Sequence, residues 1–274
     1  MSRVATIGDN CIDEYVAPVA KSAVGGSALN VALHLRRAGH EVAYVGAVGD
    51  DSAGRRILGF LDEAGVGRDL VRVVDEGHTA VTRIHLREGG EREFLSEDFG
   101  VGANYSPTED ELARLGDVEH AHLTVVGLAD WRPVAAALAR AGVAVSCDFR
   151  TSRETDNIDA VSIAFYSASR AEAEELGARA RAGGVDTVVV TCGRDGSLGA
   201  DAQGSAWVDA RTVEPVDTCG AGDSYIATFI DRRLAGASLD DAMNAATEAA
   251  SRTCLHLAAF PQELNELESQ GVER

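Results

Sequence analysis

The sequence predicts an α/β protein with a mostly parallel central sheet, helices on both faces of that sheet and a small β lid. Three observations carry this prediction. Short apolar runs alternate with helical patterns along most of the chain, and two strand-like runs around Gly89-Gly90 interrupt this alternation. The length of 274 residues suits one domain with a small appendage.

The first predicted elements follow one another as strand, helix, strand and helix. Apolar runs predict the strands, and Gly39 and Gly65, directly after the helical patterns, predict where the helices end. The stretch between the first strand and the first helix has an irregular pattern. In chain order we expect a strand at 4–8, a helix at 28–38, a strand at 41–48 and a helix at 52–64.

The next region has the pattern of an antiparallel hairpin. Runs at 81–86 and 91–95 flank Gly89-Gly90, and charged residues are interleaved with apolar ones. A hairpin that stands off a parallel sheet is a candidate lid or dimer contact. We expect a single domain over residues 1–274, with a lid formed from about 11–22 and 79–104.

The alternation resumes at Ser106-Pro107-Thr108-Glu109, which has the pattern of a capping box with Pro at the first helical position. A mixed stretch at 198–208 predicts a small antiparallel piece, and two helices close the chain. We expect strands at 120–126, 143–148, 163–167 and 187–191, and helices at about 133–141, 170–182, 222–234 and from 238 onward.

The charge composition excludes several kinds of active site. The chain has 44 acidic and 25 basic side chains, a net charge of −19, and Lys21 as its one lysine. A P-loop or a protein-kinase-type site needs a lysine in a motif that this sequence lacks, and Schiff-base chemistry would depend on Lys21 alone. The acidity argues against a nucleic-acid or anionic-membrane partner, because both bind through Lys and Arg patches.

The cysteines and the hydropathy pattern predict a cytoplasmic protein. Five cysteines are scattered without C-x-x-C spacing, as expected for free thiols in a reducing compartment. There is no run of about 18 apolar residues of the kind that a transmembrane helix needs. The N-terminus also lacks the basic and apolar segments of a signal peptide.

The segment that carries chemistry is 216–224, in which Gly220, Ala221 and Gly222 lead into a predicted helix. The first amides of a helix lack internal acceptors and carry partial positive charge, so a phosphate can bind there without a lysine. Asp223, at the mouth of these amides, is placed to accept a proton from an attacking hydroxyl. The spacing alone also fits a tight turn followed by an ordinary acid in a first helical turn.

Two segments resemble the signatures of the PfkB (ribokinase-like) carbohydrate kinases. Segment 217–224 is similar to the C-terminal signature D-T-x-G-A-G-D-[ST], and Gly25-Gly26-Ser27-Ala28-Leu29-Asn30 is similar to the N-terminal G-G-x-x-x-N. The segments lie about 190 residues apart in the family's order, and the resemblance covers essentially the whole chain. It implies a ribokinase-like three-layer sandwich and a kinase that transfers phosphate from ATP to a sugar.

The resemblance also implies roles for individual residues. Asp223 would be the catalytic base, and the anion hole for the transferring phosphate would consist of Gly220, Ala221 and Gly222. The sugar hydroxyls would be held by Asp9, Gly25, Gly26 and Asn30.

On the nucleotide side, the turn that contains Thr191, Gly193 and Gly196 resembles the family's T-x-G-x-x-G turn under the nucleotide. An ordinary β-turn between two strands explains the same spacing. Asp217 is the candidate to support a monovalent cation such as K⁺, which similar enzymes use beside the anion hole.

The predicted Mg²⁺ site departs from the family's pattern. The family often carries N-x-x-E after a central strand, where these residues position Mg²⁺ and phosphate. Here Ser169-Arg170-Ala171-Glu172 stands in that place, with Ser instead of Asn. Glu172 is the candidate to act on the metal through water, and a solvent-facing acid in the first turn of a helix is the alternative.

A finer resemblance concerns the substrate. Segment 6–13, the short length and the pair His120-Ala121 look closer to fructoselysine 6-kinases than to ribokinases or adenosine kinases. This implies phosphorylation of the 6-hydroxyl of fructoselysine or a related Amadori compound. Five acids near the lid either suit such a cationic substrate or are solvated surface charges: Asp13, Glu14, Glu93, Glu97 and Asp98.

Other functions stay open at this point. Within the same family, the chain fits a ribokinase, a fructokinase or a 2-keto-3-deoxygluconate kinase. From another class, it fits a sugar-binding regulator that keeps the fold without turnover. A dinucleotide-dependent oxidoreductase is disfavoured, because the first strand ends in Gly8-Asp9-Asn10 without a glycine fingerprint.

Three further features have two interpretations each. Similar kinases often pair their lids, so the apolar hairpin suggests a homodimer as well as a lid. His120 and His122 lie on one face of a strand, either as a metal pair or as core residues. Arg150 and Arg153 follow a strand and either reach the substrate or phosphate, or belong to a surface loop.

Overall fold

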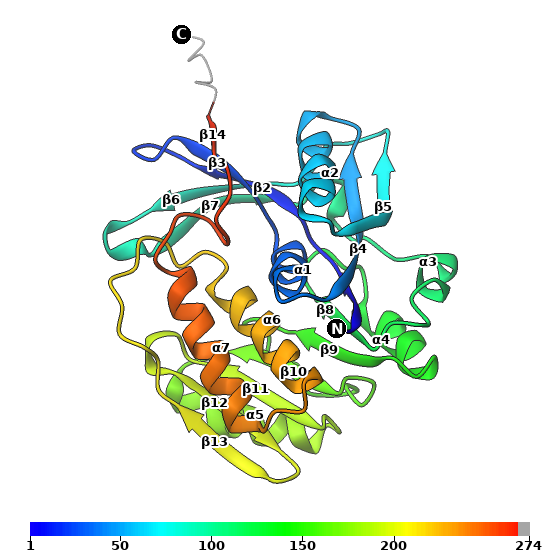
Figure 1. Ribbon diagram of the computed structural model, residues 1–274, viewed down its shortest axis with the longest axis vertical. Coiled ribbons are helices and arrows are strands. Elements are labelled where there is room, and N and C mark those ends of the chain that lie inside the picture. The colour runs from blue at the N-terminus through cyan, green and yellow to red at the C-terminus, as the bar shows by residue number, and fades with distance from the viewer. Residues whose placement is uncertain (268–274) are drawn as a thin grey trace.

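A nine-stranded sheet forms the centre of the protein, and helices cover both of its faces (Figure 1). The computed structural model describes residues 1–267, so the end of the predicted domain, 268–274, lies outside the described residues. In spatial order the strands are β13 (Gly204–Val208), β12 (Ser197–Asp201), β11 (Thr187–Thr191), β10 (Ile163–Ser167), β9 (Ala144–Asp148), β8 (His120–Thr124), β1 (Arg3–Ile7), β4 (Glu41–Gly49) and β5 (Gly67–Val74).

The sheet is parallel from β5 to β11, and β12 and β13 add an antiparallel edge. Val4 and Ala5, neighbours on β1, belong to two different hydrophobic clusters, because successive strand side chains point to opposite faces. One cluster packs under α1 (Ser27–Arg37), α2 (Ser52–Ala64), α6 (Ala221–Leu234) and α7 (Leu239–Thr253), and the other under α4 (Trp131–Arg140) and α5 (Arg170–Ala182), with α3 (Glu109–Ala113) beside α4.

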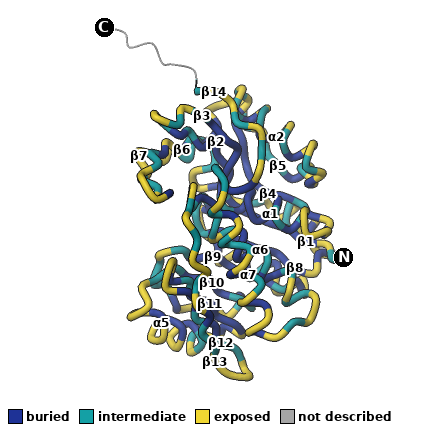
Figure 2. The backbone as a smooth tube through the Cα atoms, turned by 60° about the vertical axis from the view of Figure 1, so that its left-hand side comes forward, coloured by how far each residue is buried: buried dark blue, intermediate teal, exposed yellow. Residues whose placement is uncertain are grey.

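A second sheet of five strands forms beside the central one (Figure 1). It draws strands from both segments expected to form the lid, and Figure 2 shows β2 and β3 largely buried and β7 largely exposed. The irregular pattern expected between the first strand and the first helix is therefore wrong. In spatial order the strands are β14 (Asn265–Glu266), β3 (Lys21–Gly25), β2 (Cys11–Tyr15), β6 (Val81–Leu86) and β7 (Arg92–Asp98).

One predicted helix cap is corrected, and one strand was not predicted. The cap of α3 is Thr108 and not Ser106, because the Thr108 hydroxyl accepts the Glu111 amide at 3.2 Å and the Glu111 carboxylate accepts the Thr108 amide in return. Strand β5 was not predicted. It lies at a sheet edge, where most of its residues are partly exposed, so its sequence lacks a continuous apolar run.

The topology gathers the candidate site at the carboxyl edge of the central sheet. Asp9 follows β1, Asp148 ends β9 and Thr191 ends β11, and these parallel strands finish on the same side. The N-terminus of α6 supplies Asp223 to the same region. In residues 1–267, no helix is both long enough and apolar enough to cross a membrane.

Candidate active site

The anion-hole segment adopts a conformation that needs glycine. Gly220 caps α6 with φ +71°, and a Cβ on it would lie 2.3 Å from the Ala259 Cβ. The Ser224 amide bonds to the Gly220 carbonyl at 2.8 Å and so closes the first turn of α6. The Ala221 amide makes a long contact with the Thr218 carbonyl at 3.4 Å, and the first amides of this helix have no acceptor within the helix itself, so their role as an anion hole stays a prediction.

Asp223 lies in the first turn of α6, and Asn30 holds its carboxylate. The Asn30 Nδ2 donates to the Asp223 Oδ2 at 2.7 Å, across a sequence distance of 193 residues. Burial raises the pKa of Asp223 to about 6, and the Asn30 hydrogen bond, Arg92 and Arg150 oppose this rise while Asp9 adds to it. Asp223 is therefore ionised at neutral pH and able to accept a proton from a hydroxyl.

Asp9, expected to hold sugar hydroxyls, caps α1 in the structure. Its Oδ2 accepts the Ser27 amide at 2.8 Å, and its Oδ1 accepts the Ala28 amide at 3.1 Å and the Thr124 hydroxyl at 2.8 Å. Asp9 also lines the cavity in front of Asp223, so its contact with a sugar stays a prediction.

Asp13, one of the five acids expected near the lid, has a buried carboxylate that lines the same cavity. The Cys11 thiol donates to its Oδ1 at 3.2 Å, and burial raises the pKa of Asp13 to about 6. A Cβ on Gly25 would lie 2.1 Å from the Asp13 Oδ2, so glycine makes room for this carboxylate. Asp13 and Glu14 are adjacent acids in β2, so the strand had to be recognised before the sequence could show which of the two faces the cavity.

The glycine pair ahead of α1 also sets where that helix begins. Gly26 has φ +105°, and a Cβ on it would lie 2.4 Å from the Asn10 Cα. The Asn30 amide donates to the Gly26 carbonyl at 2.8 Å. Gly25, Gly26 and Asn30 therefore stand together where α1 begins, and this start directs Asn30 at Asp223.

Asp217 is fully buried and fastens the anion-hole loop to two other segments. Its carboxylate accepts the Tyr15 hydroxyl at 2.6 Å, the Cys219 amide at 2.8 Å and the Ala258 amide at 2.9 Å. Three protein donors thus already meet the carboxylate that was the candidate to support K⁺. A cation there would need one of them to move, and the K⁺ role stays a prediction.

The turn from Thr191 to Gly196 joins β11 to β12. Gly193 and Gly196 have φ +56° and +110°, and the Cys192 amide donates to the Gly196 carbonyl at 2.8 Å. A Cβ on Gly196 would lie 2.2 Å from the Val208 carbonyl oxygen. The geometry is that of a tight turn between strands, and the contact of this turn with a nucleotide stays a prediction.

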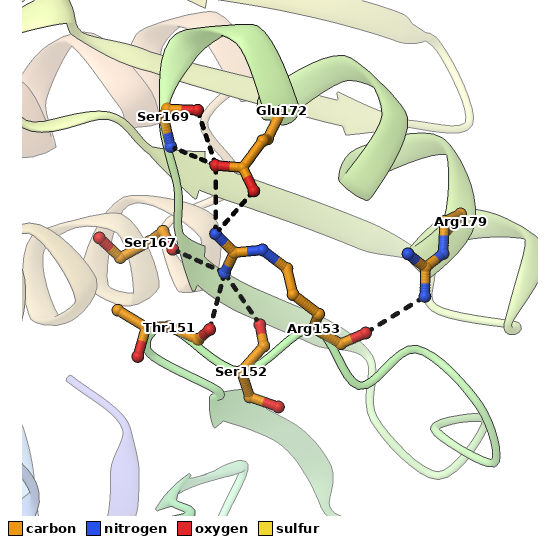
Figure 3. Close-up of polar contacts among 7 residues, drawn as sticks. All are labelled: Thr151, Ser152, Arg153, Ser167, Ser169, Glu172 and Arg179. Carbon is orange, nitrogen blue, oxygen red and sulfur yellow. Dashed lines mark hydrogen bonds and ion pairs between the residues drawn. The ribbon is translucent and has the colours of Figure 1, made fainter.

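Glu172 is held by protein donors, as Figure 3 shows. Arg153 donates to both of its oxygens at 3.2 and 3.3 Å, and the Ser169 amide and hydroxyl donate to Oε2 at 3.2 and 2.6 Å. These donors lower the pKa of Glu172, the Ser169 hydroxyl most strongly. Ser169 therefore takes part in a helix cap here, and Arg153 already donates to both Glu172 oxygens.

His120 and His122 are core residues in the structure. Their side chains share the Ser146 hydroxyl at 2.7 and 2.8 Å, and burial lowers their pKa values to about 4 and about 3. Across residues 1–267, the structure forms no group of three or more His, Cys, Asp or Glu side chains able to hold a metal ion.

A cavity lies between the lid sheet and Asp223. Asp9, Asn30 and Arg150 line its sheet side, and Arg150 has the unusual φ of +51° for a residue other than glycine. Segment 79–104, expected to form part of the lid, supplies another part of the wall, of which the sequence analysis had named only Glu97: Thr82, Arg92, Phe94, Glu97 and Phe99.

Comparison with known proteins identifies the family of the chain. The model of the pfkB family of carbohydrate kinases matches residues 16–261. The chain belongs to this family. As a carbohydrate kinase of the pfkB family, it acts on a small-molecule sugar, and the predicted family and activity are confirmed.

Curated relatives of this pfkB kinase include two whose names resemble each other. It is 33% identical to a fructoselysine 6-kinase of Shigella flexneri over 269 residues, which cover 95% of this chain and 100% of that one. It is 30% identical to a fructosamine kinase of Bacillus subtilis, with 94% and 93% of the chains covered.

Solved structures confirm the ribokinase-like fold. A ribokinase of Arabidopsis thaliana, complexed with ribose and ATP, has a TM-score of 0.82 at 22% identity and covers 94% of each chain. An aminoimidazole riboside kinase of Salmonella enterica has a TM-score of 0.73 at 22% identity, with 94% of this chain and 95% of that chain covered.

Proposed function

We propose that this pfkB kinase transfers the γ-phosphoryl group of ATP to the 6-hydroxyl of fructoselysine or a related Amadori compound, with Asp223 as the base. The observation that carries the proposal is the Asp223 carboxylate, held by Asn30 at 2.7 Å beside the first amides of α6. An attacking hydroxyl between the two would give its proton to Asp223 while the amides stabilise charge on the phosphoryl oxygens.

The nucleotide side of the proposal relies on backbone groups. Amides from Gly220 to Gly222 would bind the transferring phosphoryl group, and the turn at Thr191, Gly193 and Gly196 would lie under the nucleotide. K⁺ at Asp217 is retained as a weaker part of this proposal, because three protein donors already meet that carboxylate.

Mg²⁺ would enter with ATP and neutralise phosphate charge. Glu172 fits a direct ligand poorly, since Arg153 and Ser169 donate to its oxygens. A water-mediated contact requires Arg153 to turn away. Glu172→Gln should then raise the Mg²⁺ concentration needed for half-maximal activity, whereas equal Mg²⁺ dependence would remove Glu172 from the metal site.

The finer part of the proposal concerns the substrate's amine. Of the five acids expected near the lid, Asp13 and Glu97 line the cavity in front of Asp223. The other three have partners elsewhere: Glu14 pairs with Arg83, Glu93 pairs with Arg87, and Asp98 lies within hydrogen-bond distance of the His78 ring. Glu97, with Phe94 and Phe99 beside it on the cavity wall, suits the ammonium group of an Amadori compound.

The test of the proposed base compares the wild type with Asp223→Asn in a coupled ADP-release assay. We expect kcat to fall by about 10³-fold or more, with the sugar affinity changed by less than about threefold. Activity of the Asn variant near that of the wild type would show that another group accepts the proton. A wild type that binds sugars but turns none over would support the regulator instead.

A further inference from the structure

The start of the lid strand β7 is joined to the phosphoryl-transfer side of the site. The Gly90 carbonyl accepts the Thr218 amide at 3.1 Å and the Thr218 hydroxyl at 3.3 Å. The next residue, Glu91, forms an ion pair with Arg194 in the β11–β12 turn at 3.0 Å. The lid hairpin thus contacts both the anion-hole loop and the turn predicted to lie under the nucleotide.

Arg92 follows directly and is part of the cavity wall. It lines that cavity together with Cys219 and Asp223, and its guanidinium carbon lies 5.2 Å from the centre of the Phe94 ring. In the described part of the chain, Arg92 has no carboxylate within ion-pair distance. A half-buried cation without a direct counter-ion is costly, unless an anion joins it.

Nearby acidic groups favour the protonated form of Arg92. Cys219, Asp217 and Asp223 raise the pKa of Arg92, although burial acts against them. The arrangement therefore holds a permanent cation beside the base and the anion hole, and it leaves the planar donor face of the guanidinium without a carboxylate.

Three other cationic side chains already form ion pairs with acidic residues. Lys21, the one lysine, pairs with Glu266 in the lid sheet, and Arg153 and Arg194 pair with Glu172 and Glu91. Arg92 and Arg150 are the arginines on the cavity wall, and of these two only Arg92 belongs to the lid.

We propose that Arg92 is a further catalytic residue, which contacts the transferring phosphoryl group from the lid side, opposite the amides of Gly220 to Gly222. The inference rests on the proposed function. The segment from Glu91 into β7 then follows the order of the reactants: Glu91 meets the nucleotide side, Arg92 the reacting phosphorus, and Phe94 and Glu97 the sugar side.

The reaction balances with Arg92 as a charge stabiliser. The sugar oxygen forms a bond to the γ-phosphorus, the bond from that phosphorus to the β,γ-bridging oxygen breaks, and ADP leaves with the electron pair. The hydroxyl proton passes to Asp223. Arg92 exchanges no proton, and it donates hydrogen bonds to the phosphoryl oxygens as charge shifts in the transition state.

The first test compares Arg92→Gln with Arg87→Gln, a matched change at an arginine of the same hairpin that pairs with Glu93. We expect Arg92→Gln to lower kcat by about 10²–10³-fold, with the sugar KM changed less than about threefold, and Arg87→Gln to stay near the wild type. Equal kcat values for Arg92→Gln and the wild type would overturn the inference.

The second test measures nucleotide binding by calorimetry and does not depend on the sugar. With Mg²⁺ present, Arg92→Gln should lose affinity for a non-hydrolysable ATP analogue by about tenfold, while its affinity for ADP stays unchanged. Unchanged affinity for both nucleotides would contradict a contact with the γ-phosphate. If the wild type phosphorylates no sugar, the proposed function fails, and this measurement still decides the role of Arg92.

A third variant separates a catalytic from a structural role. Arg92→Lys keeps the charge but not the planar fork, so it should recover part of the rate lost in Arg92→Gln. If both variants lose the same rate and the same thermal stability, Arg92 supports the lid fold and the inference is wrong.

Discussion

Asp223 shows how one residue combines the chemistry of the site with a cost in stability. Its carboxylate is ionised at neutral pH although burial disfavours the charge, and Asn30 and two arginines offset that burial only in part. Burial also raises the pKa of Asp13, in the same cavity, to about 6, and the Cys11 hydrogen bond and Arg92 oppose this rise. The site therefore keeps charged oxygens ready for a substrate at the expense of the folded state.

The pKa of Asp223 leads to a prediction about stability. The folded-state pKa of about 6 exceeds the usual 3.8, so between these pH values the native state binds a proton that the unfolded state does not. The free energy of unfolding therefore falls as pH rises through this range. At pH 8, Asp223→Asn should raise it by roughly 1–3 kcal/mol, and the gain should shrink as the pH is lowered toward 5.

Denaturant unfolding at the two pH values checks this, with the exposed Asp156→Asn as the control. An Asn variant no more stable than the wild type at pH 8 would mean that the Asp223 carboxylate is not destabilised by burial. The same titration predicts that kcat/KM of the wild type decreases below about pH 6, as Asp223 becomes protonated.

A change at Glu97 tests whether the site recognises the ammonium group of the substrate. Glu97→Gln should raise the KM for fructoselysine by about tenfold and leave the KM for fructose within about twofold, because fructose has no ammonium group. Glu93→Gln on the same strand is the matched control, since Glu93 pairs with Arg87. Equal losses for both sugars would remove Glu97 from amine recognition.

At the level of elements, the site depends on how β2, β3 and α1 meet. Gly25 ends β3 opposite Cys11 of β2, and its missing side chain makes the space for the Asp13 carboxylate. Asp217 accepts the Tyr15 hydroxyl from the end of β2, so the lid sheet is also tied to the anion-hole loop. A change in β3 should therefore affect sugar binding before it affects the rest of the fold.

Gly25→Ala tests this arrangement. The new methyl group would meet the Asp13 Oδ2 at 2.1 Å, so we expect the sugar KM to rise about tenfold or more, with the affinity for ADP unchanged. Gly59→Ala on α2 is the control, because a Cβ there meets nothing within 4 Å. Calorimetric sugar binding that is the same in Gly25→Ala and the wild type would show that Asp13 can move at little cost.

The elements also show what the sequence could and could not predict. The expected bounds at 52–64, 163–167, 170–182 and 187–191 match α2, β10, α5 and β11, because apolar periodicity and a stop signal agree there. The lid expected over 11–22 contains β2, but the bounds of this strand and its register with β3 and β6 were not predicted, because distant residues set them. The signature motifs indicate an anion hole at Gly220, Ala221 and Gly222, which stays a prediction. The proposed role of Arg92 depends on the contact of Gly90 with Thr218, which no local pattern encodes.

At the scale of the whole molecule, this acidic protein brings two arginines and the N-terminus of a helix to one place. The net charge is −19, yet Arg92 and Arg150 line the same cavity as Asp223, which lies in the first turn of α6. The single domain and the lid expected from the sequence stay predictions, and so does the homodimer. Leu95 on β7 is 53% exposed, which supports pairing of two lids.

Multi-angle light scattering tests that pairing. We expect a dimer at micromolar concentration and a monomer for Leu95→Glu, whose charge would be buried at a lid–lid contact. Val73→Glu, at an exposed apolar residue of β5 on the central sheet, is the control and should stay dimeric. A monomeric wild type would remove the proposed lid contact.

The central claim is that this pfkB kinase phosphorylates Amadori compounds, and a substrate panel tests it most directly. Coupled ADP release with Mg²⁺ and ATP would be measured for fructoselysine, fructose, ribose and 2-keto-3-deoxygluconate. We predict a kcat/KM for fructoselysine at least about tenfold above that of each other sugar, with the phosphate on the 6-hydroxyl of the product. A higher kcat/KM for any of the neutral or acidic sugars would contradict the proposed substrate.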